Sequence, residues 1–119
     1  MLGNLFTVSF NYHGALAADA KGQFELLGPA TLVAVSFGCS SATAATLQVG
    51  DAGDVDGIMT AGAVGQSETP NLLEPADFDG ALCDQVAGYH FPSDDKVVEF
   101  VITHASAEDV ALVFYFQEG

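Results

Sequence analysis

The sequence predicts an all-β fold, an antiparallel β-sandwich of jelly-roll type with about seven or eight short strands. Two observations predict it. Short segments alternate apolar and polar residues with a period of two, and clusters of glycine, proline and aspartate separate them. The length of 119 residues corresponds to one domain at roughly 100–200 residues per domain, so we expect a single sandwich over residues 1–119, with residues 1–4 as a candidate extended N-terminal arm.

Residues 5–12 give the clearest strand pattern in the first half of the chain. Apolar side chains occupy every even position of this segment and polar ones most of the odd positions, as in a half-buried strand. A second alternating segment, residues 31–38, is expected to place Val33, Val35 and Phe37 on one face. Further short strands are expected at residues 24–27 and around Leu47 and Val49, with loops at residues 14–22 and 40–45.

Two more strands are predicted near the C-terminus. Residues 96–103 and 110–117 alternate around Phe100 and Phe114, which we expect to be core residues. The intervening residues 104–109 predict a hairpin that pairs these two strands.

The middle of the chain is the least regular part. Residues 66–79 contain two prolines and several acids, which predicts the longest loop. Phe78, Leu82 and Val86 recur at a spacing of four, which is compatible with one or two helical turns, although a glycine interrupts them.

The chain is strongly acidic. Sixteen acids against Lys21 and Lys96, with no arginine, give a net charge of −14. Nucleic-acid binding requires clustered lysine and arginine, and anionic lipid repels an acidic surface, so we expect neither partner. An arginine-free acidic chain is also compatible with a halophilic origin.

The negative charge is concentrated in the second half. Residues 1–49 carry a net charge of −1 and residues 50–119 a net charge of −13. Either the first half supplies more of the core strands, or the neutral half faces a partner while the acidic loops face solvent. The acids expected on outward loops include Asp77, Asp79, Asp94 and Asp95.

No segment predicts a secretory signal or a membrane span. The first residues, Met1 to Asn4, lack a basic region followed by an apolar stretch, so we expect synthesis in the host cytoplasm. The longest strongly apolar run, Leu32 to Val35, is far short of the roughly 18–20 residues that a membrane span needs.

The sequence contains no signature of an enzyme or a cofactor site. It lacks a G-x-S-x-G elbow, and its glycine-rich stretches lack the lysine that a phosphate-binding loop requires. His13, His90 and His104 are scattered, so a catalytic triad could assemble only in space. Cys39 and Cys83 have no C-x-x-C partner, and we expect small buried thiols, with a disulfide as the alternative in oxidising surroundings.

Asp51, Asp54 and Asp56 are the candidate metal ligands, because hard cations such as calcium need several convergent oxygens. Aligning Gly57 with the invariant glycine of an EF-hand puts alanines at two required ligand positions, so an EF-hand is excluded. Two interpretations of these aspartates remain open. One is an irregular cation site, and the other is an exposed turn whose aspartates form hydrogen bonds with their own backbone.

Three segments resemble small β-sandwich structural proteins of tailed bacteriophages. They are a strand with a Gly/Asp turn at residues 47–58, the segment 89–102, and the aromatic strand 110–119. Such proteins decorate or cement the capsid, commonly as trimers. The resemblance implies a non-enzymatic virion protein, a capsid decoration protein on the capsid surface, with the major capsid protein as partner, a homotrimer as the favoured state, and no catalytic or cofactor residues.

Two other functions remain open. One is a tail or head-fibre component of the same virion. The other is a carbohydrate-binding β-sandwich module, for which Tyr12, Tyr89 and Tyr115 would have to supply the aromatic platform, since the chain has no tryptophan.

Leu2, Leu5 and Phe6 are the candidate interface residues. Apolar side chains occupy both faces of the chain near its N-terminus, whereas a half-buried strand needs only one apolar face. We therefore expect the first six residues to contribute more to oligomer or capsid contact than to folding.

Overall fold

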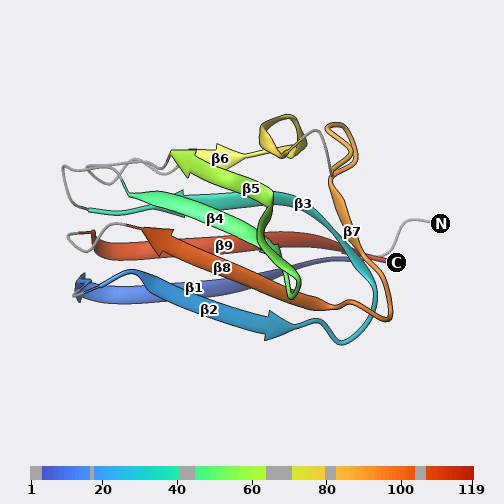
Figure 1. Cartoon of the computed structure of the whole chain (residues 1–119), viewed down its shortest axis with the longest axis horizontal. Coiled ribbons are helices and arrows are strands. Elements are labelled where there is room, and N and C mark those ends of the chain that lie inside the picture. The colour runs from blue at the N-terminus through green and yellow to red at the C-terminus, as the bar shows by residue number, and fades with distance from the viewer. Residues whose placement is uncertain (1–3, 17, 41–44, 64–70, 80–82, 104–106) are drawn as a thin grey trace.

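Two antiparallel β-sheets pack face to face (Figure 1). The computed structural model describes residues 4–16, 18–40, 45–63, 71–79, 83–103 and 107–119. Its strands are β1 (Leu5–Ala15), β2 (Ala20–Glu25), β3 (Ala30–Gly38), β4 (Thr46–Asp51), β5 (Asp54–Ala63), β6 (Asn71–Leu73), β7 (Tyr89–Phe91), β8 (Val97–Thr103) and β9 (Glu108–Glu118), with a single 3₁₀ turn at Pro75–Asp77 among the described residues.

The strand order is that of a jelly roll. Sheet A has the order β1-β9-β3-β6, with β7 also paired to β3, and sheet B has the order β2-β8-β4-β5. The first and last long strands are therefore neighbours in one sheet, and β2 and β8 are neighbours in the other, as in a double Greek key. This arrangement confirms the predicted antiparallel sandwich of jelly-roll type.

The described residues form nine strands instead of the seven or eight predicted, because two short strands take the place of one at an edge of sheet A. The short β6 and β7 pair with different parts of β3, β6 with Val35 to Phe37 and β7 with Ala30 to Leu32. Together they extend along the same edge of sheet A.

The predicted hairpin over residues 104–109 is wrong. The strand β8 pairs with β2 and β4 in sheet B, whereas β9 pairs with β1 and β3 in sheet A. The two strands instead face each other across the core, where the ring centroids of Phe100 and Phe114 are 5.7 Å apart. Alternation predicts which side of a strand faces the core but not which strand lies beside it, so both arrangements share one sequence pattern.

Phenylalanine rings fill most of the space between the sheets. Phe100 and Phe114 are fully buried, which confirms their predicted place in the core. Gly22 lies directly opposite Phe100 in the pairing of β2 with β8, and the ring occupies the space that a Cβ at position 22 would need. The other fully buried phenylalanines are Phe37, Phe91 and Phe116.

A bulge in β3 removes Val33 from the core face. The register of β3 against β9 shifts between Leu32 and Ala34, so Val33 is the extra residue. Leu32, Val35 and Phe37 are buried, while Val33 is only partly buried. The predicted face is right for Val35 and Phe37 and wrong for Val33, because the bulge shifts the alternation by one residue.

Residues 83–88 form a tight turn, and the helical turns predicted here do not occur in the described part of the chain. The Asp84 carboxylate accepts hydrogen bonds from the N–H groups of Val86 and Ala87. Phe78 is buried whereas Val86 is 90% exposed, so these residues do not share one apolar face. Leu82 lies outside the described residues.

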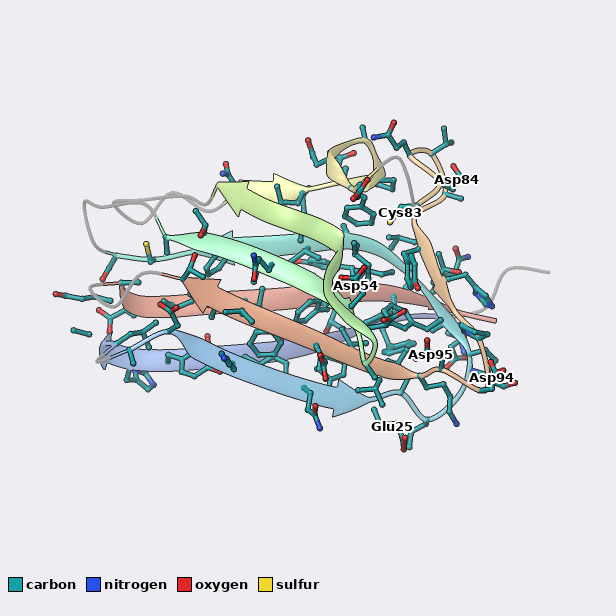
Figure 2. All side chains as sticks on the ribbon, in the orientation of Figure 1. Glu25, Asp54, Cys83, Asp84, Asp94 and Asp95 are labelled. Carbon is teal, nitrogen blue, oxygen red and sulfur yellow. The ribbon has the colours of Figure 1, made fainter. Side chains whose placement is uncertain are left out.

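The acidic side chains that the structure describes lie at the surface. Among the described residues no charged side chain is buried. Figure 2 shows Asp94 and Asp95 beside Glu25 at one end of the sandwich. Asp77 and Asp94 are exposed, and Asp79 and Asp95 are partly exposed, as predicted.

Candidate functional site

The outer face of sheet A carries no charged side chain between the ends of its strands. Partner residues in the register and the alternating burial assign the outward side chains of each strand. They are Leu5, Thr7, Ser9, Asn11 and His13 of β1, Ala111, Val113, Tyr115 and Gln117 of β9, Thr31, Val33, Ala34 and Ser36 of β3, Leu72 of β6 and His90 of β7. Aspartate and glutamate appear only at the strand ends, as Glu108, Asp109 and Glu118.

The outer face of sheet B differs. Lys21 and Glu25 of β2 are exposed, and Glu99 of β8 is partly exposed on the same face. A chain of net charge −14 therefore places charge on one sheet face and excludes it from the other. Depletion of charge is the property that distinguishes the centre of a protein–protein interface from ordinary surface.

A shallow apolar groove crosses the outer face of sheet A. It has a volume of about 510 Å³ and its lining includes Leu5, Thr7, Val33, Leu72 and Tyr115. Leu5 is 73% exposed and Leu72 is 56% exposed, although both are large apolar side chains. The β3 bulge supplies Val33 to this groove, so the residue lost from the core becomes part of the outer surface.

A second apolar groove is lined by residues of β1 and β2, the edge strands of the two sheets, which lie next to each other in Figure 1. Its volume is about 540 Å³, and its lining includes Phe6, Val8 and Phe24. Leu27, which is wholly exposed, and Pro29 also line this groove.

The predicted interface residues Leu5 and Phe6 lie on opposite faces of β1. Leu5 lines the outer groove, whereas the ring of Phe6 stacks on Phe116 with centroids 5.2 Å apart and packs against the core. Phe6 therefore supports the sandwich as well as lining both grooves. Leu2 lies outside the described residues.

Both oxygens of the Asp51 carboxylate accept hydrogen bonds from the protein. Its Oδ1 accepts from the N–H groups of Gly53 and Asp54 at 3.0 Å each, and its Oδ2 accepts from the Tyr89 hydroxyl at 2.9 Å. Burial, together with that hydrogen bond to Asp51, raises the pKa of Tyr89 to about 12. Desolvation and the neighbouring Asp51 raise the pKa of Asp95.

These contacts give Asp51 a structural role at the β4–β5 turn. The described residues include no group of three or more acids, histidines or cysteines placed to hold a metal ion. Asp54 follows Asp51 in the same turn, and the Asp56 side chain is outside the described part of the structure.

The serine and histidine side chains do not form a nucleophile and base pair in the described residues. The Ser40 hydroxyl donates to Asp109 Oδ2 at 3.0 Å, and Gly14 N–H donates to Asp109 Oδ1 at 2.9 Å. These two bonds, and to a smaller extent the nearby His13, lower the pKa of Asp109. His90 is 3.2 Å from the Thr31 hydroxyl, and His104 and Ser41 lie outside the described residues.

Cys39 and Cys83 are both buried and are not joined in a disulfide. Burial, with a smaller contribution from Asp79, raises the pKa of the Cys83 thiol. A raised pKa favours the thiol over the reactive thiolate, as expected for a structural cysteine.

The described residues thus define a jelly-roll sandwich with one uncharged sheet face and an apolar open edge. No family model matches the sequence, and no curated protein matches it. No helix among the described residues is long and apolar enough to span a membrane.

Three solved structures are similar to this chain. A chain from the capsid asymmetric unit of cyanophage Pam1 superposes with a TM-score of 0.57 at 17% identity, covering 99% of this chain and 87% of that one. The nucleoplasmin-like N-terminal domain of Drosophila FKBP39 gives a TM-score of 0.43 at 11% identity, covering 97% and 91%. A chain of desmodium yellow mottle tymovirus gives 0.43 at 8% identity, covering 98% and 87%. The likeness to the Pam1 chain, at 17% identity, shows the fold alone.

Proposed function

We propose that this protein is a non-enzymatic virion structural protein, a decoration protein that binds the outer surface of a capsid lattice through the outer face of sheet A. The observation that carries the proposal is the absence of charge from that face in a chain of net charge −14. A face of uncharged and apolar side chains can be desolvated at low cost, whereas an isolated buried charge cannot.

The similarity to a chain of the Pam1 capsid asymmetric unit supports the proposal. The alignment covers 99% of this chain and 87% of the other, so the two chains have similar lengths. A chain in a capsid asymmetric unit is repeated across the lattice. A small protein in that setting gains binding strength from repetition, because each linked copy raises the effective concentration of the next contact.

Mass spectrometry of purified virions of the virus that encodes this chain tests the proposal. Decoration requires a number of copies comparable with that of the major capsid protein. A few copies per virion would instead indicate a tail or head-fibre component. Absence from virions, combined with binding to a glycan array, would favour the carbohydrate-binding module instead. The aromatic platform of such a module would be Tyr115, which is half-exposed in the outer groove.

We further propose that the protein assembles as a homotrimer, which would bring a net charge of −42 together. Repulsion between exposed acids is largely screened beyond a Debye length of about 8 Å at physiological salt and about 3 Å at 1 M. Trimer formation is therefore expected to strengthen when salt or magnesium is added.

Analytical ultracentrifugation of micromolar protein over a salt series measures this effect. The expected result is a rising trimer fraction from low to high ionic strength. A Leu72→Asp variant provides the control: Leu72 is 56% exposed on the face proposed to bind the capsid, so its trimer fraction should follow that of the parent over the same salt series. A single monomeric species at every salt and magnesium concentration would contradict the trimer.

A further inference from the structure

We propose that the free edge of β1, together with the groove between β1 and β2, is a strand-addition site. It would take an extended segment of another protein in which apolar and polar residues alternate and a lysine or arginine lies at one end. The inference rests on the proposed function, since it names the chemistry of the partner on the capsid.

Three of the four sheet edges carry features that discourage pairing with another strand. The β2 edge has the charged side chains Lys21 and Glu25, and the β5 edge has two register irregularities against β4 and begins at Asp54. The edge formed by β6 and β7 consists of two strands of three residues each. Charge, bulges and short length are the usual means by which sheet edges avoid unwanted pairing.

Over residues 5–12 the β1 edge has none of these features. It is 11 residues long, its residues 5–13 contain no proline and no charged side chain other than His13, and its only irregularity against β9 lies between Tyr12 and Ala15. Among the described strands, only β9 pairs with β1. A long, regular, uncharged edge is a template for an added strand.

The hydrogen-bond register shows which backbone groups are available. The Glu118 N–H donates to the Asn4 carbonyl at 2.9 Å, and Leu5 lies opposite Gln117. Antiparallel residue pairs alternate between bonded and non-bonded, so Asn4 and every second residue after it bond to β9. The N–H and C=O groups of the intervening residues therefore point to the free edge, namely those of Leu5, Thr7, Ser9 and Asn11.

The space beside this edge suits the side chains of an added strand. Phe6, Val8, Phe10 and Phe24 face the interior of the sandwich, yet they are only partly buried because nothing described covers them at the open side. A strand paired to β1 would direct every second side chain into the groove of about 540 Å³ that three of these residues line. The fit therefore calls for apolar residues at alternate positions of the partner.

The charges at the groove identify the partner as a different protein rather than a second copy. Glu25 and Glu118 lie at its rim, both exposed, and Figure 2 shows Glu25 at the end of β2. A second copy would bring its own Glu25 and Glu118 with its β1. The chain has only two basic residues against sixteen acids, so a second copy would add net negative charge: Lys21 is exposed on the outer face of sheet B, and the Lys96 carbonyl accepts from the Leu26 N–H. Complementary charge must then come from another chain.

A peptide titration tests the site directly. The probe is a blocked octapeptide that alternates valine and threonine between terminal lysines, and the control is the same peptide with terminal glutamates. Nuclear magnetic resonance is expected to show saturable amide shifts at Leu5, Thr7, Ser9 and Asn11 with the lysine peptide. Affinity for the glutamate peptide should be on the order of tenfold lower. Shifts on another face, no shifts, or equal binding of both peptides would overturn the proposal.

Matched variants separate the backbone contact from folding. Ser9→Pro removes an N–H that points to the free edge and is expected to reduce affinity by about tenfold or more, whereas Ser9→Ala keeps the N–H and should bind like the parent. Leu27→Asp alters a wholly exposed groove residue and should weaken binding without lowering the melting temperature. Val86→Asp, at a 90% exposed residue of the 83–88 turn, should leave binding unchanged.

The outcomes distinguish this site from the proposed function. Virions that carry the Ser9→Pro and Leu27→Asp chains at full copy number would overturn the strand-addition site and leave the decoration role standing. A wild-type chain that binds the lysine peptide but is absent from virions would overturn the decoration role and leave the strand-addition site standing. A wild-type dimer that Ser9→Pro converts to monomer would also overturn the proposal, because the occupant would then be a second copy.

Discussion

The variant Phe114→Ala is expected to lose about 3–5 kcal/mol of unfolding free energy, the typical cost of truncating a fully buried phenylalanine. Phe114 is 0% exposed, and its ring lies 5.2 Å from that of Phe24 and 5.7 Å from that of Phe100. It therefore joins sheet A to both β2 and β8 of the opposite sheet. Natural domains are stable by only about 5–15 kcal/mol, so this loss is a large share of the total stability. Urea denaturation measures the change.

A second core variant and a surface variant on the same strand test this prediction further. Phe100→Ala should have a similar effect, because Phe100 is 1% exposed and packs on Phe10 and Phe114. Tyr115→Ala changes the neighbouring aromatic residue on the same strand, but its side chain faces outward, so the loss should be much smaller. Equal denaturation midpoints for Phe114→Ala and Tyr115→Ala would show that the face assignment of β9 is incorrect.

The sequence predicted the strands better than it predicted their neighbours. The alternation at residues 5–12, 31–38 and 110–117 reflects which side of each strand faces the core, and that is a local property. Pairing is not local. β8 and β9 are adjacent along the chain yet lie in different sheets, because the jelly roll places β2 and β4 beside β8. The bulge at Val33 likewise depends on the β9 register and leaves no mark in β3 alone.

The candidate surface was predictable only in part. The low charge of the first half anticipated the neutral character of β1 and β3, but the face is completed by β9, β6 and β7 from the acidic second half. A usable signal was present at alternate positions of the last strand, where Ala111, Val113, Tyr115 and Gln117 are all uncharged. That β1 is an edge strand could not be inferred, since edge position is a property of the whole sheet order.

The second large effect on stability is expected for Gly88→Ala, which adds a single methyl group to the turn before β7. Gly88 has a φ of +103°, and its N–H donates to the Asp84 carbonyl at 2.9 Å. The chain passes so close to β3 here that a Cβ at position 88 would overlap the Leu32 carbonyl. Gly88→Ala must therefore adopt an unfavourable backbone conformation and also push β7 away from β3. We expect a loss of at least about 2 kcal/mol, measured by urea denaturation.

Two other glycine-to-alanine changes isolate the contributions to that loss. Gly14 has a φ of +74°, and no atom lies within 4 Å of the place that a Cβ would take, so Gly14→Ala should show only the conformational cost, about 1–2 kcal/mol. Gly28 also has open space and no left-handed φ, so Gly28→Ala should be neutral or stabilising by up to about 1 kcal/mol. The excess loss of Gly88→Ala over Gly14→Ala then measures the contact with Leu32. If the two variants were equally stable, β7 would not approach β3 as closely as the structure places it, and the split strand position in sheet A would need a different explanation.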